Sequence, residues 1–142
     1  VLKSGYSGKC GLFDLSDGKQ VIDFRYDDIT LLGFNRALGK DGSRRYLLDT
    51  STGDVIASLP PNIGAAHFNE TPVTWIFRAK SYYGIIDEEG NILYEDAKDP
   101  LTGVTKFRHG FSGGQKDNKK WGILKSDGTW LVHPTYDYIK LL

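Results

Sequence analysis

Short apolar runs alternate with polar, glycine-containing turns along most of the chain. Runs such as Val21-Ile22, Val55-Ile56 and Trp130-Leu131-Val132 have strand length and are rich in β-branched or aromatic residues. Within residues 73–79, one face of a predicted strand carries Val73, Trp75, Phe77 and Ala79. Only residues 34–38 fit a single helical turn, and no segment has the apolar spacing of an amphipathic helix. The pattern predicts an all-β, antiparallel protein of about ten short strands.

One sequence unit recurs along the chain. It reads as a basic or aromatic residue, glycine, two apolar residues, a polar residue, and a polar turn that ends in glycine. The turn glycines are Gly18, Gly53, Gly90 and Gly128, spaced by 35, 37 and 38 residues. A unit of two or three strands cannot bury its apolar face alone, so neighbouring units must pack together. We expect about four antiparallel, three-stranded repeats.

The ends of the chain also fit this repeat. Residues 24–32 match residues 134–142, three repeats further on, and residues 1–9 resemble the strand that enters each later repeat. The N-terminal strand is therefore expected to complete the last repeat and close the repeats into a propeller- or barrel-like ring. Glycine recurs inside one strand of the unit, as Gly11, Gly84 and Gly122, which predicts that a neighbouring side chain or backbone approaches closely there.

Composition limits the other interpretations. Lys plus Arg equals Asp plus Glu, at 18 each in 142 residues, so no overall field draws the protein to nucleic acid or to an anionic membrane. The length fits a single β domain over residues 1–142. Cys10, the sole cysteine, reads as a small buried apolar residue. With no apolar run of membrane-spanning length, the chain is expected to be cytoplasmic and to bind no membrane.

With these residues in view, the chain resembles the bacterial WG-repeat (KWG) family. The match is best at Lys120-Trp121-Gly122-Ile123-Leu124, Asp127-Gly128 and His133-Pro134-Thr135-Tyr136-Asp137. The chain departs from the family pattern where Cys10 and Tyr83 replace Trp, Tyr46 replaces Gly, and Lys125 replaces Asp. The resemblance implies a β-rich interaction scaffold without enzymatic activity, cofactor or catalytic residues. Small stand-alone members are similar to the immunity proteins encoded beside bacterial toxins.

Patterns typical of catalysis or metal binding are not found. His67, His109 and His133 are widely spaced and lack the pairings of a metal site. The glycine-rich segment 110–116 is neither a P-loop nor a dinucleotide fingerprint, and it is expected to be a long hairpin loop. No nucleophile has a plausible base beside it. The sequence therefore predicts a protein that is not an enzyme.

Charge is segregated along the chain. Residues 87–99 carry six carboxylates against one lysine, and residues 106–125 carry six basic residues against one carboxylate. These segments form either two patches of opposite charge or ordinary solubilising turns. The basic segment, with Trp121, leaves open a nucleic-acid-binding module as an alternative function. A fragment of a larger structural repeat array is another.

The preferred hypothesis is a non-catalytic protein-binding module, an immunity protein that neutralises a bacterial toxin by covering its active surface. A nuclease toxin attracts phosphates with basic residues, so its inhibitor gains association rate by presenting carboxylates. The tyrosines near the acidic segment would serve as anchors. The predicted partner-binding residues are Tyr82, Tyr83, Asp87, Glu88, Glu89, Tyr94, Glu95 and Asp96.

Overall fold

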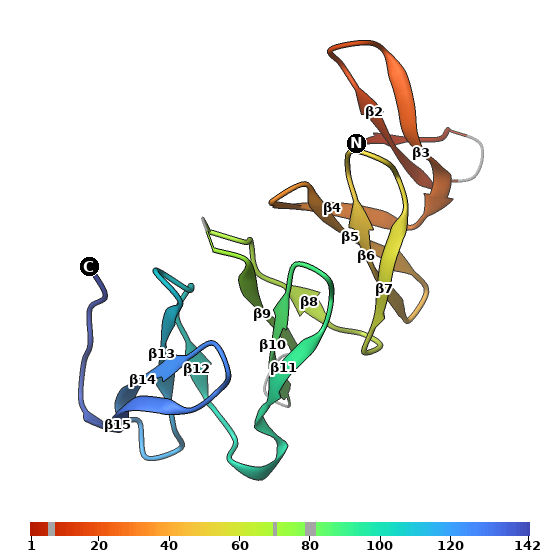
Figure 1. Ribbon diagram of the computed structural model, residues 1–142. Coiled ribbons are helices and arrows are strands. Elements are labelled where there is room, and N and C mark those ends of the chain that lie inside the picture. Colours follow the sequence, from red (N-terminus) through yellow and green to blue (C-terminus); the bar gives the residue numbers. More distant parts are fainter. Residues whose placement is uncertain (6–7, 70, 79–81) are drawn as a thin grey trace. The chain divides into compact units, whose positions relative to one another are not determined.

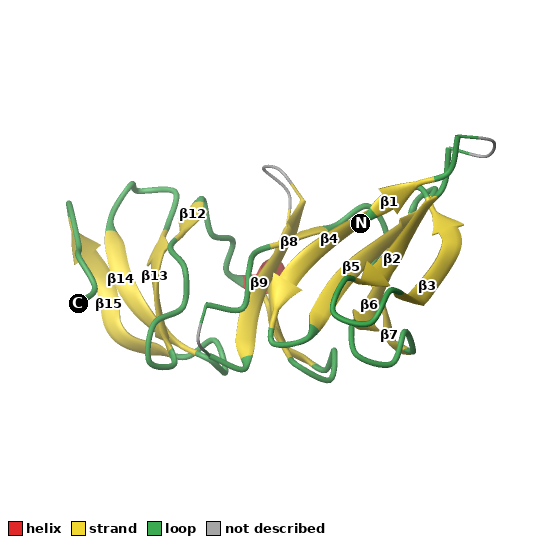
Figure 2. Ribbon diagram, turned by 90° about the horizontal axis from the view of Figure 1, so that it is seen from above, coloured by secondary structure: helices red, strands yellow, loops and turns green. Residues whose placement is uncertain are grey.

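The computed structural model of the chain confirms the all-β prediction (Figures 1 and 2). It describes residues 1–5, 8–69, 71–78 and 82–142, which form fifteen strands and one 3₁₀ turn, η1 (Asp96–Lys98). The strands are β1 (Leu2–Lys3), β2 (Cys10–Asp14), β3 (Lys19–Tyr26), β4 (Asp28–Gly33), β5 (Arg36–Asp41), β6 (Arg44–Asp49), β7 (Val55–Leu59), β8 (Gly64–Ala65), β9 (Val73–Arg78), β10 (Tyr82–Asp87), β11 (Ile92–Glu95), β12 (Gly103–Val104), β13 (Phe111–Gln115), β14 (Trp121–Lys125) and β15 (Trp130–Tyr136).

The chain divides into two compact units, Val1–Ile63 and Gly64–Leu142. The first contains the sheets β1-β2-β3 and β4-β5-β6-β7, and the second contains β11-β10-β9-β8 and β12-β13-β14-β15. Every pairing is antiparallel and joins strands that are adjacent in sequence. A division into compact units does not decide whether they fold together, so the single domain over 1–142 stays a prediction.

Two expectations about the sheets are wrong. Three of the four sheets have four strands instead of three, because β4, β8 and β12 each add a leading strand. The expected closure by the N-terminus also fails, because β1 pairs with β2 through Leu2–Gly11 and Lys3–Cys10. The last sheet takes all its strands from the second unit, and the described strands form separate sheets instead of one closed barrel.

Two local predictions are also corrected. Residues 34–38 do not form a helical turn, because Phe34 and Asn35 both have positive φ, and β5 begins at Arg36. Such a pair of residues makes a tight hairpin turn between β4 and β5. The glycine-rich segment 110–116 is not a loop, since most of it is the strand β13. In β9, Val73 and Trp75 are buried while Phe77 is partly exposed, and Ala79 lies outside the described residues.

Each unit has its own apolar core. In the first unit, Cys10 is 6% exposed and packs with Leu12, Ile22 and Tyr26 from β2 and β3, as expected for a small buried residue. In the second unit, Trp75 packs with Ile85, Leu101 and Phe107, and its ring stacks on Phe107 with centroids 5.4 Å apart. The indole Nε1 of Trp75 donates to the Ser112 hydroxyl at 2.9 Å, so the buried polar edge of this ring is satisfied.

The glycines inside the repeat strands make the close approach that the sequence predicts. A Cβ at Gly11 would lie 2.7 Å from the carbonyl oxygen of Ile22, and one at Gly122 would overlap that of Val132. The pairing explains the crowding, because three residues of the partner strand bulge opposite each of these glycines. Gly84 has no such bulge, and there the hydroxyl of Tyr82 takes up the space.

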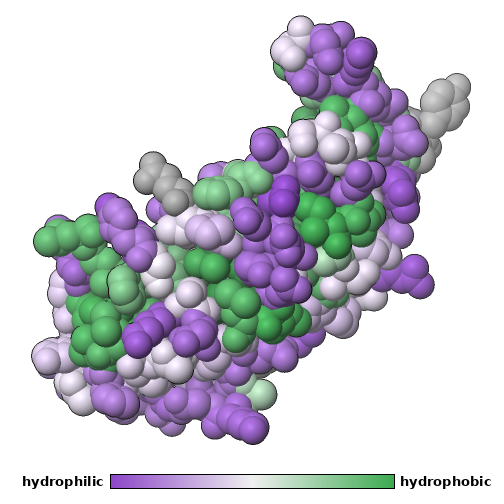
Figure 3. Space-filling view, viewed as in Figure 1, coloured by the Kyte–Doolittle hydropathy of each residue, from purple (hydrophilic) through white to green (hydrophobic). Residues whose placement is uncertain are grey.

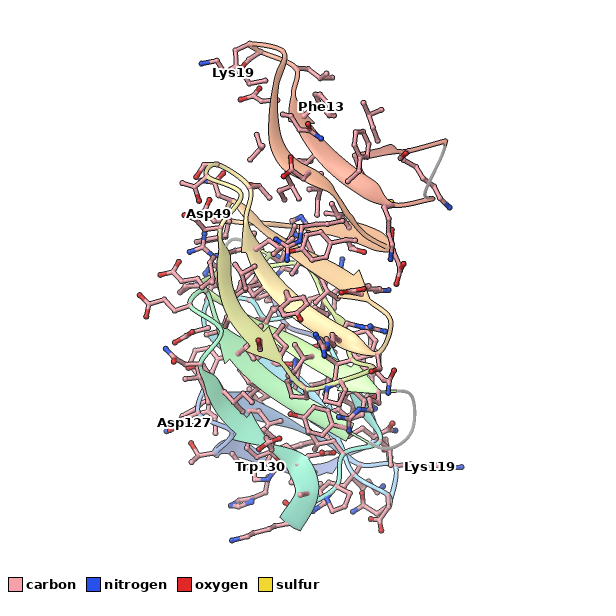
Figure 4. The ribbon with its side chains drawn as sticks, turned by 90° about the vertical axis from the view of Figure 1, so that its right-hand side faces the viewer. Phe13, Lys19, Asp49, Lys119, Asp127 and Trp130 are labelled. Atoms are coloured by element: carbon pink, nitrogen blue, oxygen red, sulfur yellow. The ribbon has the colours of Figure 1, made fainter. Side chains whose placement is uncertain are left out.

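Aspartate side chains hold the repeat turns. The carboxylate of Asp14 accepts hydrogen bonds from the amide and hydroxyl of Ser16, and Asp49 does the same with Ser51. In the fourth repeat, where Lys125 replaces that aspartate, Asp127 instead accepts from the amide and hydroxyl of Thr129. Figure 4 labels Asp49 and Asp127 at two of these hairpin ends. These local bonds fix the turn geometry in each repeat.

These turns predict a loss of stability in acid. Bonds from the neighbouring hydroxyl, and then from the backbone amide, lower the pKa of Asp14, Asp49 and Asp127 below its ordinary value. Their contribution is complete above the unfolded pKa of about 3.9 and is lost as the pH falls through the lowered values. We expect the urea midpoint to fall between pH 5 and 2, and to fall less in the triple variant Asp14→Asn, Asp49→Asn, Asp127→Asn. NMR titrations that place the pKa of these three carboxyl groups at or above the ordinary value would contradict this prediction.

Candidate protein-binding face

The eight predicted binding residues come from one hairpin and the turn that follows it. Tyr82, Tyr83 and Asp87 lie on β10, Glu88 and Glu89 lie in the hairpin turn, and Tyr94 and Glu95 lie on β11, while Asp96 begins η1. The strands pair Gly84 with Glu95 and Ile85 with Tyr94. One supersecondary element therefore carries all eight, but their side chains point to different environments.

Tyr82 and Glu95 contact each other across the two strands of the hairpin. The Tyr82 hydroxyl donates to Oε2 of Glu95 at 2.7 Å, across the strand pair. The guanidinium of Arg78 lies over the Tyr82 ring, 4.9 Å from its centroid, in a cation–π contact. Burial, and then the bond to Glu95, raise the pKa of Tyr82 well above its ordinary value. The ring is thus held in place between a cation and an anion.

The position of Tyr82 is a lysine in two other repeats, and each of these lysines forms an ion pair. Lys9 binds Asp27 with 2.5 Å between Nζ and Oδ1, and Lys120 pairs with Asp137. In each case the lysine lies two residues before the strand glycine, as Tyr82 lies two residues before Gly84. The third repeat therefore has a tyrosine where the other two have a lysine. Its acceptor is not the equivalent residue, because Glu95 pairs with the strand glycine, whereas Asp27 and Asp137 follow the partners of the residues before their glycines. This substitution places a half-buried aromatic ring where a lysine would stand.

The turn carboxylates have two different roles. Asp87 accepts from the amides of Glu89 and Asn91, at 3.0 and 2.9 Å, and from the Asn91 side chain. Asp87 therefore holds the turn, as Asp14 and Asp49 do in their repeats. Glu89 is exposed and Glu88 is half-buried at the tip. These two glutamates are the carboxylates at the tip of the turn.

Three of the predicted residues serve the interior of the second unit. Tyr83 and Tyr94 pack edge-on against Trp75, with centroids 6.1 and 6.5 Å apart. Asp96 is only 5% exposed, and its carboxylate accepts from the amides of Tyr83 and Leu101 at 2.9 and 3.1 Å. The expectation that Asp96 is an exposed turn position is therefore wrong. Its charge is used to bind backbone amides that would otherwise be buried without partners.

Tyr94 also joins the two sheets of this unit. Burial, and then the charge of Asp96, raise its pKa. Its ring lies against Gly128, the turn glycine of the fourth repeat, where a Cβ would overlap the ring. Gly128 has a φ of 83°, so both its conformation and its contact favour glycine. Tyr94 therefore connects neighbouring repeats in addition to facing the core.

Sequence reasoning missed two exposed apolar residues on the same hairpin. Ile92 and Leu93 of β11 are 44% and 39% exposed, although their β-branched and aliphatic character reads as core. β11 lies at the edge of its sheet, which leaves these side chains without a covering strand. Hydrophobic patches also interrupt the hydrophilic surface seen in Figure 3. Their exposure depends on the position of β11 at the edge of its sheet, and the sequence alone does not show that position.

The two charged segments are not separate patches throughout. Lys116 of the basic segment pairs with Asp99 of the acidic segment, and Lys120 pairs with Asp137. Trp121 is half-buried and its ring packs against Gly103 of β12. Within the described ranges, no group of three or more His, Cys, Asp or Glu could hold a metal ion. The described residues also include no helix long and apolar enough to cross a membrane.

A comparison with known protein families identifies one of the repeats. Residues 121–141 match the family model of the WG containing repeat. This segment includes Trp121-Gly122 on β14, the turn at Gly128, and β15 with its bulge. The chain therefore contains a WG repeat within an all-β fold. No curated protein sequence matches the chain significantly.

Two solved structures are similar to the chain at low sequence identity. The computationally designed Ika8 protein aligns with a TM-score of 0.56 and 12% identity, over 87% of this chain and 42% of its own chain. BamB from Moraxella catarrhalis aligns with a TM-score of 0.46 and 17% identity, over 87% of this chain and 36% of its own. The chain thus spans less than half the length of either structure. At 12% identity the likeness to Ika8 concerns the fold alone.

Proposed function

We propose that this protein is a non-catalytic binding module that recognises another protein through the outer side of the β10–β11 hairpin. The observation that carries the proposal is the exposure of Ile92 and Leu93 on an edge strand, with Glu89 and Glu95 exposed close by in the same hairpin. An apolar centre with a polar rim is the usual composition of a protein interface. Tyr82, held between Arg78 and Glu95, adds an aromatic side chain whose position is already fixed.

The partner that suits this surface is a basic protein. We infer a bacterial toxin whose active surface attracts phosphate groups, which this protein would cover in the manner of an immunity protein. Carboxylates at Glu88, Glu89 and Glu95 would steer such a partner into contact and reject acidic surfaces. The apolar residues beneath them would slow dissociation once the surfaces meet. No chemistry is required, because covering the active surface is sufficient for inhibition.

The deciding experiment is a binding titration against the product of the neighbouring gene. We expect the double variant Glu88→Lys, Glu89→Lys to slow association by about tenfold or more at low salt, since electrostatic steering acts on the association rate. Ile92→Ser with Leu93→Ser is expected to accelerate dissociation instead. Stopped-flow or surface plasmon resonance measurements separate the two rates.

The control is a double reversal of exposed carboxylates in the other unit, Asp23→Lys with Asp54→Lys, which changes the net charge equally. Both charge variants should keep the wild-type urea midpoint. A partner that responds equally to both pairs would show that only net charge matters. Absence of binding to the neighbouring gene product would favour a scaffold role within a repeat array.

A further inference from the structure

A second surface of the Gly64–Leu142 unit is not used by the proposed interface. Its cations are Lys106, Arg108 and Lys140, all exposed. They line one depression of about 350 Å³, together with Asn69, Thr105, Ile139 and Leu141. In the part of the chain that the structure describes, none of the three cations takes part in an ion pair. By contrast, Lys116 and Lys120, from the same basic segment, are both paired.

An apolar cavity continues from this depression. About 270 Å³ in volume, it shares Thr105 and Lys106 with the basic depression, and its other walls are Ala66, Trp75, Phe77, Tyr83 and Val104. Phe77 is 37% exposed, so this cavity opens to solvent beside a large aromatic ring. Among the described residues that line the two depressions, there is no aspartate or glutamate. One groove therefore combines an apolar end with a basic end.

The segment along this groove alternates in the manner of an extended chain. Phe107 is 2% exposed, and the hydroxyl of Thr105 is turned to the amide of Gly113 at 2.8 Å. Val104, Lys106 and Arg108 therefore share the side of this segment opposite Phe107 and line the groove, to which Thr105 also contributes. Side chains on one face of an extended peptide are about 6.6 Å apart, so an antiparallel peptide can match three such positions in succession.

The edge of the sheet supplies the remaining element. β12 is the outermost strand of β12-β13-β14-β15 and is only two residues long. A sheet edge of this kind can accept the backbone of an added strand, while neighbouring pockets select its alternate side chains. Arg108 Nη1 also donates to the carbonyl of Leu141 at 3.4 Å, which holds this cation beside the C-terminal segment.

We propose that this groove binds an extended acidic segment of a protein. Its backbone adds along the edge of β12, an apolar side chain enters the cavity between Phe77 and Val104, and carboxylates at alternate positions reach Lys106 and Arg108. Lys140 contacts a further carboxylate from the opposite wall. A single-stranded nucleic acid also offers anions, but it has no peptide groups to extend a sheet edge and no aliphatic side chain for the cavity.

The test is a fluorescence anisotropy titration of the full chain with a labelled extended peptide that carries one leucine and three glutamates at alternate positions, separated by threonine. The triple variant Lys106→Gln, Arg108→Gln, Lys140→Gln is expected to weaken binding by about 30-fold, since three surface charge contacts are lost. The matched control Lys19→Gln, Lys98→Gln, Lys125→Gln removes three exposed cations elsewhere and should leave the affinity unchanged. Val104→Asp should also abolish binding, because it places a negative charge at the apolar end of the groove.

Three outcomes would overturn the proposal. They are no binding of this peptide at millimolar concentration, equal losses in the two triple variants, and tighter binding of a single-stranded oligonucleotide than of the peptide. Amide NMR shifts on titration should be centred on Val104, Thr105 and Lys106. The variant Glu88→Lys, Glu89→Lys tests the proposed function and should not lower the affinity for the peptide. The two proposals can therefore be confirmed or rejected separately.

Discussion

Replacement of Asp96 by alanine is expected to destabilise the second unit by about 3 kcal/mol or more. The carboxylate is buried, and its two oxygens separately accept from the backbone amides of Tyr83 and Leu101. Alanine would leave both amides without a partner, at a cost of about 1–3 kcal/mol each. The affected amides lie on β10 and in the segment that leads to β12, so the loss would loosen the contact between the two sheets.

Two further variants separate the buried bonds from the charge. Asp96→Asn keeps one acceptor oxygen and should lose about half as much as alanine, because only one amide is left unbound. Glu95→Ala removes an exposed carboxylate next to Asp96, and we expect a loss of at most about 1 kcal/mol from its bond to Tyr82. Urea denaturation followed by tryptophan fluorescence gives these values. A loss below about 0.5 kcal/mol in Asp96→Ala would contradict the buried role.

Gly122→Ala is expected to have a comparable or larger effect, of about 3 kcal/mol or more. A Cβ at this position would overlap the carbonyl oxygen of Val132 and lie 2.8 Å from backbone atoms of His133 and Pro134. These are main-chain atoms of the bulge in β15, so they cannot move aside as a flexible side chain can. Relief of the overlap requires β15 to shift away from β14, which breaks ladder hydrogen bonds and opens the core.

The matched control is Gly18→Ala, at a hairpin turn where nothing lies within 4 Å of the added Cβ. Its φ of 72° makes the alanine strained, so a loss of about 1–2 kcal/mol is expected. Gly11→Ala tests the equivalent bulge of the first unit, where a Cβ would lie 2.7 Å from Ile22 O. If Gly122→Ala costs no more than Gly18→Ala, crowding by the bulge is not the reason for this glycine.

The same variants test the expected single domain. All three tryptophans, Trp75, Trp121 and Trp130, belong to the second unit, so their fluorescence reports on that unit, whereas circular dichroism reports on both. A single domain requires Gly11→Ala to lower the fluorescence transition together with the circular dichroism transition. A fluorescence transition that stays at the wild-type midpoint would show that the two units unfold independently.

The hairpins could be predicted from the sequence because the residues that form each turn lie close together in the chain. Asp14, Ser16 and Gly18 carry the turn within five residues, and Gly11 signals the crowding by the bulge. β8 and β12 could not be predicted. Each has only two residues and begins with a glycine, Gly64 or Gly103, so neither shows the alternation of apolar and polar residues that indicates a strand. β13 reads as a loop because Gly113 and Gly114 serve packing: a Cβ on each would lie 2.6 Å from Ile139 and 2.7 Å from Leu124.

The geometry of the candidate site could be predicted only in part. Sequence charge points to the β10–β11 hairpin, but it counts Glu89 and Asp96 alike. Only the fold reveals that Glu89 faces solvent while Asp96 is buried against two amides. Similarly, the aliphatic pair Ile92-Leu93 reads as core, and becomes surface because β11 has no outer neighbour. Whether this hairpin binds a partner stays a prediction.

The sequential order of strands in every sheet has a consequence for how such a chain can change over generations. Among the described residues, each strand pairs only with a strand next to it in sequence, so none of these pairings depends on a distant segment within its sheet. Duplication or deletion of a whole hairpin unit in the gene would therefore leave the remaining ladders intact, as in other repeat proteins. Individual copies can also differ locally, as the third does with Tyr82 at the position where two other repeats have a lysine.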